Sequence, residues 1–146
     1  MATATQQPIQ LSNSKALTAG ILAGLGGGLV FGGMMAMQGM LPMVAMLVGS
    51  ENPIIGFGVH MLISAVIGAI YGLVAARLPQ SYGVGIVAGA VNGVIWWVLG
   101  ALVMMPMMLG MNEMVFQVGP MQWMSLVGHL IFGVIAGVLF VPLTQR

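Results

Sequence analysis

The stretch that decides the fold is Gly56-Phe-Gly-Val-His60-Met-Leu-Ile-Ser64-Ala-Val-Ile-Gly68-Ala-Ile-Tyr-Gly72. In a helix, residues four apart lie above one another on nearly one face. That face carries small residues and one histidine: Gly56, His60, Ser64, Gly68 and Gly72. A second copy of the pattern occurs near the end of the chain, at Ser125, His129, Gly133, Gly137 and Val141. The only two histidines therefore occupy the same position of a repeated helix, on a face suited to close contact.

The composition indicates a protein solvated by lipid. Of the 146 residues, 60% are hydrophobic and only 3% are charged, whereas a soluble domain carries roughly a quarter of charged residues. The chain has no cysteine, which excludes disulfides, thiolate metal sites and a cysteine nucleophile. Its net charge of +1 gives no electrostatic reason to expect a nucleic-acid partner.

Four apolar runs are long enough to cross a bilayer core, which takes about 20 helical residues. They are Leu17 to Met40, Pro53 to Ala76, Gly83 to Met105 and Met121 to Val141. Turn-forming and charged residues separate them, and Pro142 is expected to end the last. Strands are not expected, because no period-2 alternation occurs and open sheet edges cannot face lipid. The predicted fold is all-α, with four transmembrane helices.

The charged residues predict the orientation. Lys15, Arg77 and Arg146 would lie on one side of a four-span protein, and Glu51 and Glu113 on the other. By the positive-inside rule, both termini are predicted to be cytoplasmic. Residues 1–14 lack the features of a secretory signal and are interpreted as a polar cytoplasmic tail.

The two halves resemble each other. Gly20-Ile-Leu-Ala-Gly24 matches Gly85-Ile-Val-Ala-Gly89, and Met40-Leu-Pro-Met43 matches Met104-Met-Pro-Met107. We therefore predict two tandem helical hairpins, residues 15–77 and 78–146, within one membrane domain. Two spans per repeat give both copies the same orientation, with a pseudo-twofold axis along the membrane normal.

The matched prolines, Pro42 and Pro106, each lie near the end of an odd-numbered span. Proline removes a backbone donor and clashes with the preceding turn. Spans one and three are therefore predicted to kink there, with Met43 to Val48 and Met107 to Met111 as short segments at the outer interface.

Small residues at helical spacing predict close helix packing, since lipid tails are as apolar as leucine and helices associate through tight backbone approach. The predicted packing residues are Gly20, Gly24, Gly28, Gly32, Ser64, Gly68, Gly72, Gly85, Gly89, Gly93, Gly133 and Gly137. They could all be used within one bundle. Alternatively, one stripe is left for a homo-oligomer or a partner membrane protein.

An ionisable residue within a span marks a function by default. His60 and His129 are predicted at matching depth and could face each other. They could ligate a haem, or each could hold the magnesium of a chlorophyll-type pigment. The alternative is that Ser64, Ser125 or a backbone carbonyl simply satisfies each imidazole.

Methionine is abundant, with 16 residues, and every one after Met1 falls in the predicted outer half. Thioethers and imidazoles are soft ligands suited to Cu(I). His60 and His129, together with Met40, Met43, Met104 and Met107, therefore form a candidate copper site. The alternative is that methionine fills irregular gaps near helix breaks.

Other functional groups are scarce. Glu51 and Glu113 are the only carboxylate side chains, and they lie in different outer turns, so no set of catalytic groups can be assembled. We do not expect an enzyme. Gln38 and Asn92 are amides within the spans and are expected to form interhelical hydrogen bonds. A small-solute channel or carrier stays open as a further function.

The paired His-x-x-x-small helices, at His60/Ser64 and His129/Gly133, and the Met-Pro-Met runs at 40–43 and 104–108 resemble a family of small bacterial integral membrane proteins. The resemblance implies a four-helix protein of the bacterial inner membrane and no assigned activity. The expected function is a non-catalytic membrane protein that packs as an oligomer or as an accessory subunit in lipid. A haem-, pigment- or copper-binding protein is the alternative.

Overall fold

The computed structural model describes residues 11–145, and every regular element in that range is helical. Four helices are long and apolar enough to cross a membrane: α1 (Asn13–Met37), α3 (Pro53–Ala75), the composite helix Tyr82–Met108, and α6 (Pro120–Thr144). The composite helix consists of α4 (Tyr82–Trp96), the π-helical segment η2 (Trp97–Met104) and α5 (Met105–Met108). The all-α fold predicted for an integral membrane protein is confirmed.

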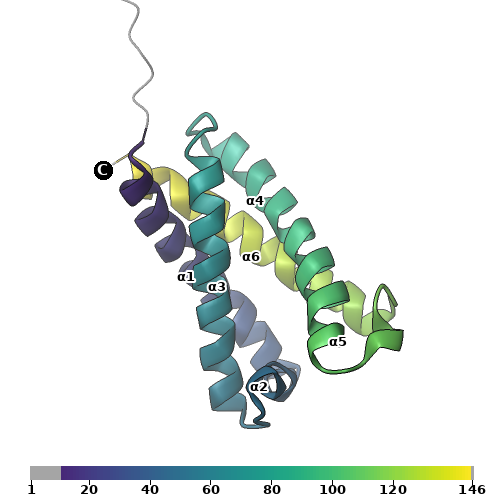
Figure 1. Cartoon of the computed structure of the whole chain (residues 1–146). Helices are drawn as coiled ribbons and strands as arrows, with labels where there is room; N and C mark the ends of the chain where they lie inside the picture. The colour runs from purple at the N-terminus through teal and green to yellow at the C-terminus, as the bar shows by residue number, and fades with distance from the viewer. Residues whose placement is uncertain (1–10, 146) are drawn as a thin grey trace, which may run out of the picture.

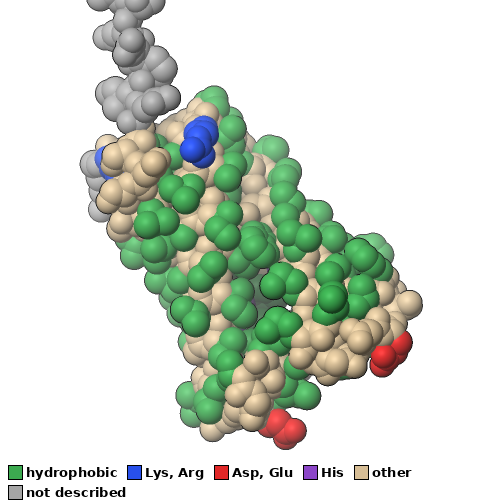
Figure 2. Space-filling view, viewed as in Figure 1, with side chains coloured by type: hydrophobic (Ala, Val, Ile, Leu, Met, Phe, Trp, Pro, Cys, Tyr) green, Lys and Arg blue, Asp and Glu red, His purple; other side chains and the backbone are tan. Residues whose placement is uncertain are grey.

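The elements divide the molecule into two ends (Figure 1). The start of α1, the end of α6 and the loop between α3 and α4 lie at one end. The short helices α2 (Leu41–Ala45), η1 (Met46–Val48), α5 and η3 (Asn112–Met114) lie at the other. Basic side chains gather at the first end and acidic side chains at the second (Figure 2). Residues 1–10 of the predicted tail, and Arg146, lie outside the described residues.

Two hairpins form through close contact between glycines. In the first, α1 packs on α3, and a Cβ atom added at Gly24 would lie 2.7 Å from the Cα of Gly68. In the second, α4 packs on α6, and a Cβ atom added at Gly89 would lie 2.8 Å from the carbonyl carbon of Gly133. The predicted packing residues lie on helix faces that contact a neighbouring helix of the same chain. They are Gly20, Gly24, Gly28, Gly32, Ser64, Gly68, Gly72, Gly85, Gly89, Gly93, Gly133 and Gly137.

The hairpins meet on one side only. Helix α6 packs along α1, where Phe132 lies against Gly27 and Phe31 lies against Gly128. Helices α3 and α4, by contrast, make few contacts and diverge away from their connecting loop (Figure 1). The four helices therefore form a bundle with one open side.

The first span ends at Gly39, which corrects the predicted kink at Pro42. Gly39 has a positive φ of 67°, its N–H donates to the Ala36 carbonyl, and the Met40 N–H donates to the Met35 carbonyl. These bonds form a Schellman motif, which ends a helix through a left-handed glycine. Pro42 lies in the first turn of α2, where its missing N–H costs no helical hydrogen bond. The short segment predicted after the proline is present as α2 and η1.

The third span is not interrupted at Pro106 either, since its helix continues to Met108. It widens into η2, where the Met105 N–H donates to the Gly100 carbonyl five residues back. Pro106 cannot donate to Leu102, and the Phe116 N–H supplies that bond from the following loop at 3.0 Å. Pro142 also fails to end its helix, since α6 continues to Thr144. Proline removes one bond, and another group or the helix end can compensate.

The glycine contacts predict a specific sensitivity to an added methyl group. Gly24→Ala places a Cβ atom against Ser64 and Gly68 of α3, and should lower the free energy of unfolding by about 1–3 kcal/mol, as other overpacked sites do. Thermal unfolding in detergent, followed by the near-ultraviolet circular dichroism of the tryptophans, measures the change.

Gly58→Ala is the matched control, because no atom lies within 4 Å of the position of its Cβ. Alanine has the higher helix propensity, so this variant should keep its stability or gain up to about 1 kcal/mol. Equal losses in the two variants would show that the contact between α1 and α3 is not what limits stability.

Candidate functional site

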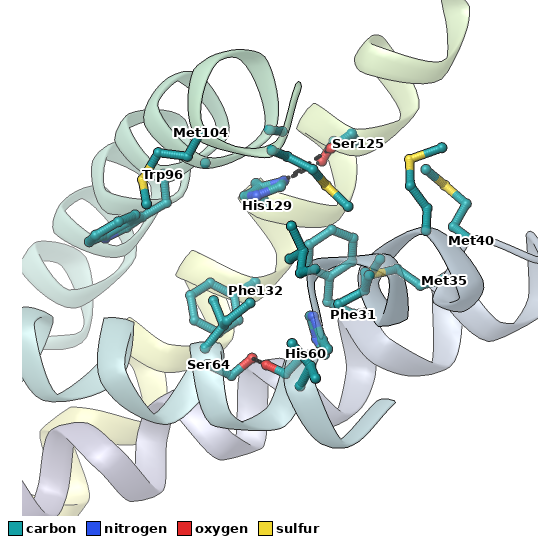
Figure 3. A pocket seen from close by; sticks show the side chains of 18 of the residues that line it. Phe31, Met35, Met40, His60, Ser64, Trp96, Met104, Ser125, His129 and Phe132 are labelled. Atoms are coloured by element: carbon teal, nitrogen blue, oxygen red, sulfur yellow. Dashed lines mark hydrogen bonds between the residues drawn. The ribbon is translucent and has the colours of Figure 1, made fainter. Parts of the chain in front are cut away.

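A cavity of about 410 Å³ lies on the open side of the bundle, toward the end that carries α2 and α5. All four spans contribute to its wall, together with α2 and η1. Figure 3 shows His60 and His129 on this wall, with Phe31, Trp96 and several methionines around them. Both sequence-predicted histidines therefore line the same cavity, whose surface is otherwise mostly apolar.

His60 is fixed across the hairpin between α1 and α3. Its Nε2 atom donates to the Gly28 carbonyl oxygen at 3.0 Å, and its side chain is only 7% exposed. Ser64 does not bond to the ring; its hydroxyl donates to the His60 carbonyl oxygen at 2.8 Å. A neutral imidazole that donates from Nε2 carries its lone pair on Nδ1.

His129 is fixed within its own helix. Its Nδ1 atom donates to the Ser125 carbonyl oxygen at 2.8 Å and lies 3.3 Å from the Ser125 hydroxyl oxygen. The lone pair of this ring, in its neutral form, is therefore on Nε2. Each histidine is oriented by one bond to a backbone carbonyl, which leaves its other nitrogen as an acceptor or a metal ligand.

Phe31 separates the two histidines. Its ring centroid lies 5.3 Å from that of His60 and 4.9 Å from that of His129, with both contacts edge-on. Figure 3 shows Phe31 between the two imidazoles. The sequence left open whether the two histidines face each other, and in the structure both rings contact the intervening Phe31. Sequence analysis missed Phe31, although Gly128, directly before His129, is the small residue that admits its ring.

The methionines of the cavity differ in part from those predicted. Met40, Met43 and Met104 line it, but Met107 is 57% exposed and is not part of the wall. The methionines that complete the wall are Met35, Met105, Met108 and Met124. The π-helical turn preceding α5 explains the change, because it shifts each following residue around the helix axis relative to an α-helix.

The segment η2 is held in place by α6 and by the loop that precedes α6. The Trp97 indole N–H donates to the Gln122 carbonyl oxygen of α6 at 2.9 Å, and its ring stacks on Trp123 with centroids 6.0 Å apart. Phe116, whose φ is 59°, supplies the bond to Leu102. Left-handed backbone is uncommon for a bulky residue, and here it accompanies the bond that satisfies the Leu102 carbonyl.

The amides in the spans do not behave as predicted. The Asn92 amide nitrogen is buried and has no hydrogen-bond partner among residues 11–145. Gln38 lies at the cavity wall, just after α1 ends. The interhelical hydrogen bond expected from Asn92 is therefore not formed by its donor.

Among the described residues, no group of three or more His, Cys, Asp or Glu side chains could hold a metal ion. Family models, curated proteins and solved structures were compared with the chain, and none matches. The predicted family and the tandem repeat stay predictions.

Phe31 should be the residue on which the cavity wall depends most. Phe31→Ala removes a ring that is 8% exposed and contacts both imidazoles, so it should cost about 3 kcal/mol of unfolding free energy, near the lower end for buried phenylalanine. Leu29→Ala is the control, because Leu29 lies two residues away and is 57% exposed. Thermal unfolding that shifts equally in both variants would contradict this assignment.

Proposed function

We propose that this protein is a non-catalytic integral membrane protein that holds Cu(I) in the cavity between its two hairpins. The observation that supports the proposal is that both oriented histidines and seven methionines line the same cavity. The ligands available there are soft and uncharged, which matches the preference of Cu(I).

The hydrogen bonds of the two rings favour a role in metal binding over a purely structural role for the histidines. A buried histidine needs a partner for its N–H, and the Gly28 and Ser125 carbonyls supply one to each ring. The same bonds fix the tautomer and the orientation of the ring, as they do in known metal sites. Because Phe31 lies between the two rings, the free lone pair of one of them, Nε2 of His129 or Nδ1 of His60, would bind the ion together with methionine thioethers of the wall.

A tetrapyrrole fits the cavity less well. A haem bound by both histidines must lie between them, where Phe31 stands. The cavity volume of about 410 Å³ is also near the lower end of the range for small-molecule sites, which suits an ion better than a pigment with a tail.

The orientation supports the same function. We infer that the basic end faces the cytoplasm of a bacterial cell, by the positive-inside rule. The cavity then lies toward the extracytoplasmic side, near α2 and α5. The expected oligomer or accessory-subunit role stays a proposal, and such an interface would use residues other than the glycine stripes, which contact the chain itself.

Copper binding can be measured by titrating the purified protein with Cu(I), under reducing anaerobic conditions, against a chromophoric Cu(I) chelator. We expect the wild type to bind a stoichiometric ion. His129→Ala and Met104→Leu should each weaken the affinity by more than about tenfold, since a lost oriented ligand costs at least as much as a lost supporting group.

Met37→Leu and Met107→Leu are matched controls, because these methionines are 84% and 57% exposed and lie outside the cavity wall. Both should bind copper as the wild type does. The proposal fails if the wild type does not compete with the chelator, or if the control variants lose affinity as strongly as the cavity variants.

A further inference from the structure

A second cavity, of about 750 Å³, lies in the cleft between α3 and α4. Its wall is apolar, and several of the side chains along it are exposed on the membrane-facing side of the spans: Ile70, Val74, Val87, Val91 and Ile95. Figure 2 shows that this face of the molecule is hollowed and surrounded by hydrophobic side chains. A molecule dissolved in the bilayer can therefore enter the cleft from the side.

One polar group in this cleft lacks a partner. The Asn92 amide nitrogen is buried and makes no hydrogen bond with any described residue. The wall also carries the Trp96 indole and the Tyr71 hydroxyl, which lies 3.5 Å from the Gly85 carbonyl oxygen and donates to it. An unsatisfied donor within a membrane costs several kcal/mol, so the cleft is suited to an occupant that brings a hydrogen-bond acceptor.

Larger side chains on α4 prevent α3 and α4 from packing closely along this cleft. On the closed side of the bundle, Gly26 and Gly27 of α1 admit Leu139 and Phe132 of α6. Counted from the matched residues Gly24 and Gly89, the positions of Gly26 and Gly27 correspond in α4 to Val91 and Asn92. Side chains at these two positions prevent the backbone approach that closes the other side.

The position of Asn92 along the membrane normal limits which acceptor groups can reach it. Asn92 lies ten residues after Tyr82, where α4 begins, which is about 15 Å along a helix and about half of a hydrocarbon core roughly 30 Å thick. The ester carbonyls of glycerolipids lie at the edge of that core and do not reach this depth. The backbone carbonyls of a partner helix are already hydrogen-bonded within that helix.

We propose that the cleft binds a lipid-soluble carbonyl compound of the quinone class. A ring carbonyl accepts the hydrogen bond of the Asn92 amide, the flat ring lies against Trp96, and the hydrocarbon tail follows the apolar wall. Trp96 lines both cavities, so the ring lies beside the site proposed for copper. The inference does not rest on copper binding, because it uses different residues.

Quenching of tryptophan fluorescence by decylubiquinone, with the full-length protein in nanodiscs, tests the proposal. We expect saturable quenching in the wild type, most of which is lost in Trp96→Phe. Asn92→Leu should weaken the apparent affinity about fivefold, the effect of one net hydrogen bond. Decylbenzene, which has the same tail and no carbonyl, should compete poorly for the wild type.

Gln38→Leu is the matched control, because this amide lies outside the cleft, and its affinity should equal that of the wild type. Val91→Phe fills the cleft while keeping Asn92, and should abolish saturable binding even if Asn92→Leu proves unstable. Non-saturable quenching, equal affinities of wild type and Asn92→Leu, or equal competition by decylbenzene would overturn the proposal. Retention of a glycerophospholipid that depends on Asn92, seen by native mass spectrometry, would also overturn it.

Discussion

Close approach of helix backbones is the interaction on which the rest of this structure depends. In a bilayer, apolar side chains gain little by leaving lipid for protein, so helices associate through packing and polar contacts. Here the contacts join backbone to backbone, with Gly24 against Gly68 in one hairpin and Gly89 against Gly133 in the other. A contact that requires a missing Cβ atom on both helices defines the register between them. That register brings the carbonyl of Gly28 to the ring of His60.

The cavities follow from packing that is tight on three sides and open on the fourth. Helices α1 and α6 close through small residues, and the residue before His129 is Gly128, which admits Phe31. The residue before His60 is Val59, which lines the cavity instead. This chain closes one side for stability, and both cavities lie on the side left open.

The sequence was sufficient to predict the spans and the residues at the glycine contacts, because both depend on composition and on helical spacing. It was insufficient for the end of the molecule that carries α2 and α5. The break in the first span comes from the left-handed backbone at Gly39 rather than from Pro42, and a glycine in a glycine-rich helix gives no local sign of such a role. The bond from the Phe116 N–H to the Leu102 carbonyl oxygen depends on a loop that returns to η2 from 14 residues further along the chain. For the same reason, the exclusion of Met107 from the cavity could not be predicted.

The two histidines occupy matching positions in the sequence, yet their hydrogen bonds differ. His60 reaches across to α1, whereas His129 bonds within α6 to Ser125. The matched glycines are used differently, since Gly28 accepts from the His60 ring whereas Gly93 lies against the backbone oxygen of His129. One ring consequently offers Nδ1 and the other Nε2, with Phe31 between them. An occupant of this cavity therefore meets two unlike nitrogens on opposite sides of an aromatic ring, so the site is asymmetric even where the sequence repeats.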